Sequence, residues 1–357
     1  MPMLAEFVDG VIGVDTHRDT LAAAALSSVG GVLAQTAVPA DAAGYQALLG
    51  FADAYLPGRR CWAIEGAGSY GAGLATLLRS AGEPLVEAGR PKRPPRRSSA
   101  KTDAIDAVRA ARDALGQPPQ QLPAVRQRGD HQARRVLLTT RRTALAARVA
   151  AVNQLKALLV SAPEELRAKL PDLPTNQQVA DCAALDRPTK SLEHRMTARA
   201  LRCTARRVQA LQAAAEELLA ELERLVAAIA PWLLEAFGVG PVSAAQLLVS
   251  WSHAGRFRSQ AAFAALAGTS PIPACSGQVV RHRLNRRGDR QLNQALHTIV
   301  LVRLRDDPET RAYAARRTAE GKSSRDIKRC LKRIIARQLF RLLQRYDQPG
   351  VEVLMAA

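Results

Sequence analysis

The sequence is poor in aromatic residues and has no long apolar runs. Aromatic side chains make up 4% of the 357 residues although 47% are hydrophobic, so a core must be built mainly from Ala, Leu and Val. No apolar run approaches the roughly 20 residues that span a bilayer, and the first residues lack a basic segment followed by an apolar one. We therefore expect a cytoplasmic protein with no membrane partner.

Cysteine is scarce and scattered. No C-x-x-C pair occurs, and the six histidines do not complete a zinc pattern with the cysteines. Reduced thiols in a cytosolic protein are the plain interpretation. The cysteines are Cys61, Cys182, Cys203, Cys275 and Cys330.

Acidic residues are outnumbered by basic ones. The chain has 51 Lys and Arg against 32 Asp and Glu, a net charge of +19. Such an excess favours a polyanionic partner, because binding releases condensed counterions. Without a membrane segment, nucleic acid is the better partner, and we expect the protein to be associated with the nucleoid.

Residues 1–125 alternate strand and helix signals. Apolar runs at 21–27 and 32–38 flank a Ser-Val-Gly-Gly turn and predict a hairpin, and Asp41 can cap a helix that follows it. An α/β domain with an antiparallel beginning is expected. Its other predicted elements are strands at 7–15, 61–65 and 84–87 and a helix at 70–80.

Residues 126–230 predict a helical coiled-coil region. A heptad seam extends over four heptads, and a looser one precedes it within 132–160. An antiparallel coiled-coil arm or dimerisation element fits this pattern, and so do two amphipathic helices packed on a globular core. The stricter seam consists of Leu201, Val208, Leu211, Ala215, Leu218, Leu222, Leu225 and Ile229; the looser one, of Leu138, Leu145, Val149, Val152, Leu155 and Leu159.

Residues 231–357 predict a mostly α-helical C-terminal domain. Gly238-Val239-Gly240-Pro241 leads into an apolar helix, which is typical of a helix-hairpin-helix element that binds phosphate through backbone N–H groups. A simple turn between two helices fits the same residues. Helices at 261–267, 291–305 and 326–345 follow.

Four acids stand out by position. Asp15 and Glu65 end predicted strands, and Asp103 and Asp106 lie on one face of a predicted helix. Mg²⁺ or Mn²⁺ needs oxygen ligands, and two-metal phosphoryl transfer needs several carboxylates. The spacing alone also fits solvated strand ends and a polar helix face.

Two basic segments are candidates for phosphate contact. The alternative is a solvated surface loop. The basic residues are Arg90, Lys92, Arg93, Arg96, Arg97 and Lys101 in the first segment, and Arg281, Arg283, Arg286, Arg287 and Arg290 in the second.

The chain resembles the DEDD transposases of bacterial insertion sequences, described as bridge-RNA-guided recombinases and related to the pilin-inversion recombinases. The resemblance covers roughly residues 9–115 and 235–345. It is carried by GVDTHRDTLAAAAL, AIEGAGSYGAGLATLLRSAG, KTDAIDA, GVGPVSAAQLL, FRSQAAFAALAGTSP and the CSG…NRRGDRQLNQAL stretch.

The resemblance implies an RNase H-like (RuvC-like) domain with metal ligands at Asp15, Glu65, Asp103 and Asp106, and a C-terminal transposase domain. It implies that Ser276 attacks DNA, and that the protein assembles as a dimer or tetramer around a structured guide RNA that pairs with donor and target DNA. Two positions depart from the family pattern: Ala67 and Cys275.

Two other functions remain open from the residues alone. One is a junction-resolving nuclease that uses the metal cluster and water, and the other is a non-catalytic nucleic-acid-binding protein. A serine hydroxyl needs a base or a metal for activation, and His282 is too far along the sequence from Ser276 to be assigned as that base.

Overall fold

The computed structural model divides the chain into two compact units, Met1–Gln127 and Arg128–Ala357, which are described separately. The structure describes residues 2–88, 103–123, 125, 129–170, 173–186, 191–252, 256, 257, 259–273, 282, 283, 285 and 288–346.

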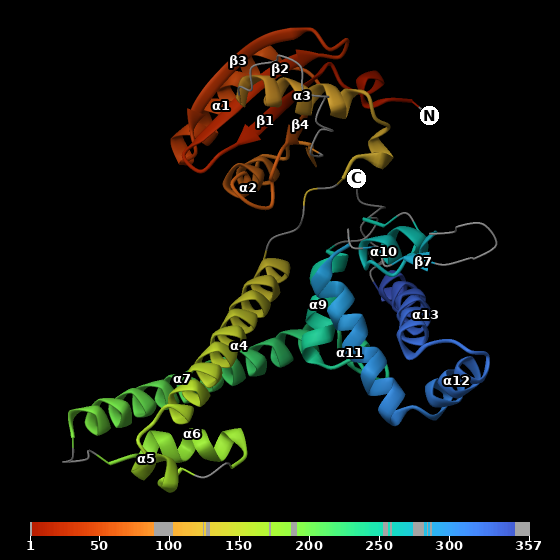
Figure 1. Ribbon diagram of the computed structural model, residues 1–357. Helices are drawn as coiled ribbons and strands as arrows, with labels where there is room; N and C mark the ends of the chain where they lie inside the picture. Colours follow the sequence, from red (N-terminus) through yellow and green to blue (C-terminus); the bar gives the residue numbers. More distant parts are fainter. Residues whose placement is uncertain are drawn as a thin grey trace. The chain divides into compact units, whose positions relative to one another are not determined.

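The first unit is built on a five-stranded mixed sheet (Figure 1). The strand order is β3-β2-β1-β4-β5; the first three strands are antiparallel, and β4 and β5 join parallel to β1. The strands are β1 (Gly10–Thr16), β2 (Thr20–Ser27), β3 (Val32–Pro39), β4 (Arg60–Ile64) and β5 (Leu85–Glu87). This is the RNase H-like architecture that the resemblance implies, and it confirms the predicted hairpin.

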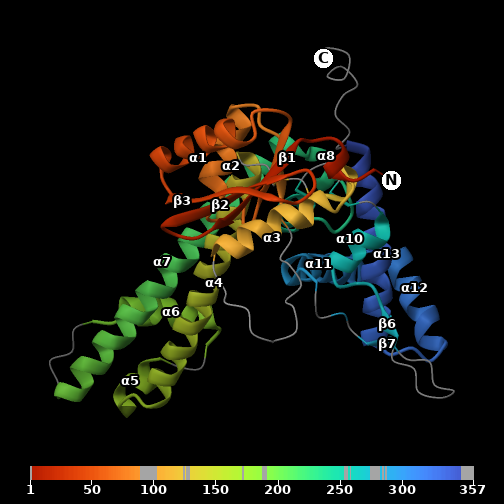
Figure 2. The same cartoon turned by 90° about the horizontal axis from the view of Figure 1, so that it is seen from above.

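Helices cover both faces of this sheet (Figure 2). On one face, α1 (Ala42–Tyr55) and α2 (Ala72–Ser80) pack against alternate strand residues such as Ile12, Val14 and Trp62. On the other face lies α3 (Asp103–Leu115), which packs against the sheet mainly through alanines. Such small side chains are expected in the core of a sequence that is poor in aromatic residues. Asp41 caps α1 as predicted, accepting from the Gly44 N–H at 2.8 Å.

Two long helices pair in the second unit. They are α4 (Asp130–Val160) and α7 (Leu192–Ile229). Leu138 of α4 shares a core cluster with Leu222, whereas Leu155 shares one with Leu201, so the helices are antiparallel. Shorter helices, α5 (Glu164–Lys169) and α6 (Thr175–Ala184), lie between them in sequence.

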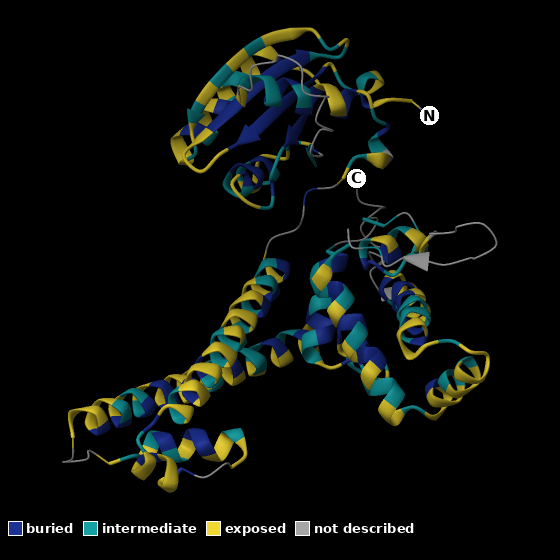
Figure 3. Ribbon diagram, in the orientation of Figure 1, coloured by how far each residue is buried: buried dark blue, intermediate teal, exposed yellow. Residues whose placement is uncertain are grey.

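The predicted heptad seam largely faces the inside of this pair (Figure 3). Leu201, Val208 and Leu222 are buried, and Leu211 and Leu218 are half-buried. Two of the predicted seam residues are exposed to solvent: Ile229 of the stricter seam is 39% exposed, and Val149 of the looser seam is 55% exposed. The two helices thus pair within one chain over most of the length of the predicted seams, and the assignment of a coiled coil stays a prediction.

The C-terminal part of the unit is helical, as predicted. Its helices are α8 (Pro231–Leu234), α9 (Pro241–Trp251), α10 (Gln260–Leu266), α11 (Arg290–Asp306), α12 (Pro308–Ala319) and α13 (Ser324–Tyr346), with a short antiparallel pair β6 (Ile272–Pro273) and β7 (His282–Arg283). Helix α12 was not predicted. Trp251, Phe257, Phe263 and Phe340 pack with ring centroids 5.2–6.1 Å apart.

The turn between α8 and α9 needs a glycine. Gly238 has a φ of +81°, a conformation that side chains disfavour, and α9 begins after Gly240.

The hydrophobic core of the C-terminal part includes residues on both sides of position 230, among them Val226 and Leu233. The division of the second unit at 230 into a coiled-coil region and a transposase domain stays a prediction.

Among the described residues, α4 is the one helix with the length and mean hydropathy of a membrane span. Only 17% of the residues in its most apolar stretch are buried. The helix nevertheless packs along α7 and contacts α9. Arg148 and Lys156 interrupt the apolar second half of this helix. We assign α4 to the helical unit and not to a membrane.

Candidate metal centre and nucleic-acid interface

Asp15 and Glu65 lie at the ends of adjacent parallel strands. In the register of β1 and β4, Val14 is opposite Ile64, so the residues that follow this pair, Asp15 and Glu65, reach the same edge of the sheet. The Glu65 N–H donates to the Val14 carbonyl at 2.9 Å, and the Thr16 hydroxyl donates to the Glu65 carbonyl at 2.7 Å. These bonds fix the strand ends at which both acids stand.

Asp15 points to the side of the sheet that α3 covers. Val11, Gly13 and Asp15 alternate with the residues that face α1 and α2. Gly13 allows α3 to approach β1, because a Cβ atom there would lie 2.0 Å from the Ala107 carbonyl oxygen. Asp103 begins α3, so the close approach brings it to Asp15.

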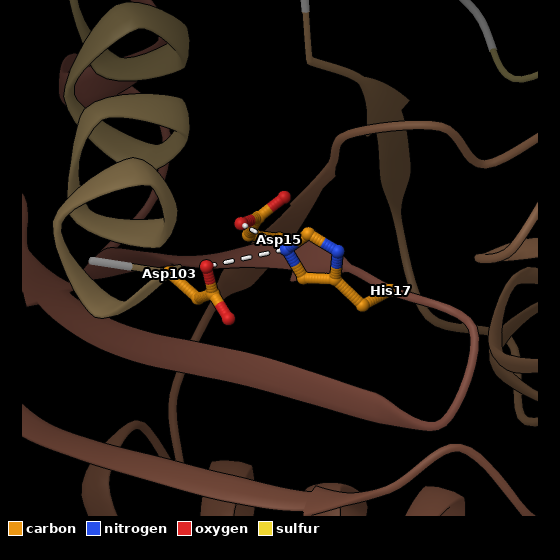
Figure 4. A group of neighbouring side chains, drawn as sticks. All are labelled: Asp15, His17 and Asp103. Carbon is orange, nitrogen blue, oxygen red and sulfur yellow. Dashed lines mark ion pairs between the residues drawn. The ribbon is translucent and has the colours of Figure 1, made fainter. Parts of the chain in front are cut away.

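His17 completes this cluster (Figure 4). Its Nε2 atom lies 3.5 Å from Asp15 Oδ2 and 3.2 Å from Asp103 Oδ1. One ligand atom from each of Asp15, His17 and Asp103 can be chosen so that all lie within 4.8 Å of one another. Asp15 is buried, whereas His17 and Asp103 are exposed, so the cluster is open to solvent on one side.

Burial raises the pKa of the Asp15 carboxyl. His17 opposes this shift, while the negative charges of Asp103 and Asp106 add to it. A buried carboxylate beside two other acids is costly as an anion, and a cation bound between them would relieve that cost. Two carboxylates and an imidazole nitrogen are therefore a donor set that fits a divalent metal.

The other two predicted ligands stand outside the closest group. Asp106 Oδ1 accepts from Arg109 Nη1 at 2.8 Å on the next turn of α3, although its charge reaches Asp15. Glu65 is placed beside Asp15 by the strand register but is not a member of the group. The structure thus brings Asp15 and Asp103 together, with Asp106 and Glu65 at the margin.

His17 was not predicted from the sequence. The zinc patterns that flag a histidine pair it with cysteine, whereas His17 pairs with acids. The available signal was its position in Asp15-Thr16-His17, because alternation in an extended segment places the first and third side chains on the same side.

Most of the predicted nucleic-acid contacts lie outside the described residues. These are Arg90, Lys92, Arg93, Arg96, Arg97, Lys101, Arg281, Arg286 and Arg287, and the predicted nucleophile Ser276 and its neighbour Cys275 also lie outside the described residues. Only the backbone of Arg283 is described, in β7. Arg290 is exposed and begins α11. Asp289 caps that helix, accepting from Gln291 and Leu292 N–H groups at 2.9 and 3.1 Å.

An RNase H-like sheet with acids gathered at a strand end and a helix N-terminus defines a metal-dependent enzyme that acts on nucleic acid. The chain belongs to the IS116/IS110/IS902 family of transposases: that family's sequence profile matches residues 230–315, and the profile of the IS110-type DEDD transposase domain matches residues 12–162. The protein is thus a transposase that binds DNA, and its acidic cluster implies a divalent metal. No curated protein matches the chain.

Proposed function

We propose that this transposase cuts and rejoins DNA through a covalent serine–DNA link, with RNA selecting the sites. The observation that carries the proposal is the meeting of Asp15 and Asp103, far apart in sequence, beside the strand end that holds Glu65. In a non-catalytic DNA-binding protein, a buried carboxylate beside other carboxylates would only lower the stability of the fold, because no cation neutralises its charge.

In this proposal, Asp15, Glu65, Asp103 and Asp106 hold one or two Mg²⁺ or Mn²⁺ ions. The metal supplies charge stabilisation for the phosphate and lowers the pKa of the attacking hydroxyl. Asp15 contributes the fixed, buried ligand, and Asp103 contributes an exposed ligand at the start of α3. Asp106 joins them by exchanging its bond with Arg109 for the metal.

Ser276 is the proposed nucleophile. Its Oγ attacks the phosphorus of a phosphodiester, the Oγ–P bond forms, and the P–O bond to one deoxyribose breaks. The serine proton passes to a base, and the released oxygen takes up a proton. Rejoining reverses these steps with a different strand end, so no ATP is needed. Arginines of the 281–290 segment would stabilise the charge on the phosphate.

A structured RNA and a homo-oligomer belong to the same proposal. The net charge of +19 supports the binding of RNA as well as DNA, because the basic residues can neutralise the phosphates of both. A dimer or tetramer places acids of one subunit against the serine of another. The protein would act in the cytoplasm, associated with the nucleoid.

The experiment follows a plasmid that carries the gene with its flanking DNA. Recombination is scored by amplifying new junctions, and covalent adducts are detected as labelled DNA that moves with the protein in a denaturing gel. Ser276→Ala should abolish both signals, and Asp15→Asn should abolish strand cleavage. Cys275→Ser is the matched control and should keep activity.

The outcomes separate the alternatives. Metal-dependent cutting by Ser276→Ala at near wild-type rate would replace the serine mechanism with attack by water. Wild-type protein that binds DNA and never cuts it, in any metal and with its flanking RNA present, would leave a binding protein. Activity that survives removal of transcribed flanking DNA would exclude RNA guidance.

A further inference from the structure

A basic depression lies on the C-terminal part of the second unit, and apart from Arg290 its lining residues have no role assigned above. It has a volume of about 690 Å³ and is lined by Arg290, Gln291, Asn293, Gln294, His297 and Lys332. All these side chains are polar or positively charged, and no acid is among them. The α11 members recur at the spacing of one helix face, and Lys332 reaches the same face from α13.

One hydrogen-bond chain fixes the position of the lysine. Lys332 Nζ donates to Asn293 Oδ1 at 3.0 Å, and Asn293 Nδ2 donates to the Ala267 carbonyl at 2.7 Å. The amide is thereby held at both ends, and its oxygen orients the ammonium. Among the described residues, no carboxylate forms a salt bridge with Lys332, so its charge is positioned without being neutralised.

The surroundings of the depression are positive as well. Burial and the nearby charge of Arg329 lower the pKa of Lys332, and burial together with Lys332 and Lys328 lowers the pKa of His297. The nearest acid in sequence, Asp289, is occupied by the α11 cap and by the Ser250 hydroxyl at 2.7 Å. Because these positive charges lie close together and partly buried, a bound anion would stabilise them.

We infer that this depression binds a phosphate of a nucleic-acid backbone, with Arg290 and Lys332 pairing with the phosphate and the Gln and Asn amides bonding to phosphate or sugar oxygens. The lining contains no Phe, Tyr or Trp side chain, so it lacks the large rings on which successive unpaired bases stack in single-strand-binding proteins. Backbone contact with a duplex is therefore favoured over capture of a single strand. The inference rests on the proposed function only in taking nucleic acid as the partner.

The test measures binding without catalysis. Fluorescein-labelled DNA duplex, RNA duplex and single-stranded DNA, each without a chosen sequence, are titrated with full-length protein in EDTA and followed by fluorescence anisotropy at several salt concentrations. Lys332→Gln removes the charge but keeps a donor for Asn293. Gln294→Glu places a negative charge on the exposed rim of the depression.

Matched controls carry the same charge changes elsewhere in the unit. Arg325→Gln lies on α13 and Gln209→Glu on α7; both are exposed and neither lines the depression. Melting curves confirm that each variant is folded. Both pocket variants should weaken duplex binding about three- to tenfold, and Lys332→Gln should reduce the salt slope by about one. The controls should change binding less than twofold, as an order of magnitude for a distant charge.

Each result has a distinct meaning. Loss on DNA and RNA duplexes alike supports a backbone site, and loss on one of them identifies the strand that occupies it. Equal losses in pocket and control variants, or a loss confined to single strands, would overturn the inference. Failure of the wild-type protein to bind any of the three probes would instead contradict the proposed function.

Discussion

Gly13 and Ala107 set the distance between β1 and α3. A Cβ atom at Gly13 would lie 2.0 Å from the Ala107 carbonyl oxygen and 2.8 Å from the Ala111 nitrogen. Both obstacles are backbone atoms, which cannot rotate away as a side chain can. The same helix carries Asp103 at its first position, so the packing at Gly13 also determines whether Asp103 can reach Asp15.

Gly13→Ala should therefore damage the metal centre from a distance. The new methyl group forces α3 away from the sheet, and overpacking of this kind costs about 1–3 kcal/mol. We expect a lower melting temperature and weaker Mn²⁺ binding by calorimetry, because Asp103 leaves Asp15. Unchanged Mn²⁺ affinity in a folded variant would show that the helix position does not govern the site.

Gly50→Ala is the matched control for this change. Gly50 lies within α1 and is exposed, and a Cβ atom added there would have no neighbouring atom within 4 Å. Alanine in a helix interior is about 0.5–1 kcal/mol more favourable than glycine. The control should thus raise the melting temperature slightly and leave Mn²⁺ binding as it is.

Much of the first unit could be predicted from local patterns. Two apolar runs on either side of a glycine-containing turn predicted the hairpin, and Asp41 predicted the start of α1. The contact between Gly13 and α3 could not be predicted, because it depends on which helix covers which face of the sheet. For the same reason, the spacing of Asp103 and Asp106 predicted a shared helix face, but it did not reveal that Asp103 meets Asp15 while Asp106 pairs with Arg109.

His17 should influence which metal the centre prefers. An imidazole nitrogen suits Mn²⁺ better than Mg²⁺, which selects oxygen ligands. His17→Ala should therefore weaken Mn²⁺ binding about tenfold, within the range for loss of one ligand or its support, and should change Mg²⁺ binding much less. Competition titrations of the two ions measure this ratio.

Arg18→Ala serves as the control, because it is adjacent to His17 and its side chain is 84% exposed. A His17→Ala variant that binds both ions more tightly would mean that the imidazole competes with the metal. The nitrogen would then occupy the cation's place instead of serving as a ligand.

Glu83 should make the first unit sensitive to acid. Its carboxylate pairs with Arg60 and accepts from the buried Trp62 Nε1 at 2.9 Å, and the Arg60 and Glu83 side chains are only 11% and 12% exposed. The hydrogen bond from Arg60 is the main cause of the lowered pKa of Glu83. The pair is half-buried and Arg60 keeps a second partner, Asp53, at 2.7 Å, so Glu83→Gln should lower the free energy of unfolding at neutral pH by about 1.5–3 kcal/mol, the range for hydrogen bonds to charged groups.

The sign of the pH dependence follows from the lowered pKa. Stability from an acid whose folded pKa is depressed is fully present above its unfolded value, 4.5, and is lost as pH falls through the folded pKa. In urea titrations, the difference in the free energy of unfolding between wild type and Glu83→Gln should be constant above pH 4.5 and should become smaller below it. Glu164→Gln, whose paired side chain is 76% exposed, should cost less than about 1 kcal/mol. A gap that widens in acid would contradict this account.

Self-association should depend on the free end of the helical pair. Because α4 and α7 are antiparallel, the end of α4 and the start of α7 lie at the same end, where Val160, Leu192 and Met196 are 77%, 66% and 47% exposed. Leu222 belongs to the core within one chain, so Leu222→Asp would unfold the unit and reveal nothing about partners.

The informative variant is Leu192→Asp combined with Met196→Asp. The two residues are one helical turn apart, so the double change places two charges on a single apolar surface while leaving the intramolecular core intact. Light scattering should show the wild type as a dimer or tetramer and the double variant as a smaller species, with equal melting temperatures. Val29→Asp, 92% exposed in the first unit, should keep the wild-type mass. If the double variant also keeps that mass, the exposed apolar end of α4 and α7 does not mediate assembly, and subunit contacts must be sought elsewhere on the chain.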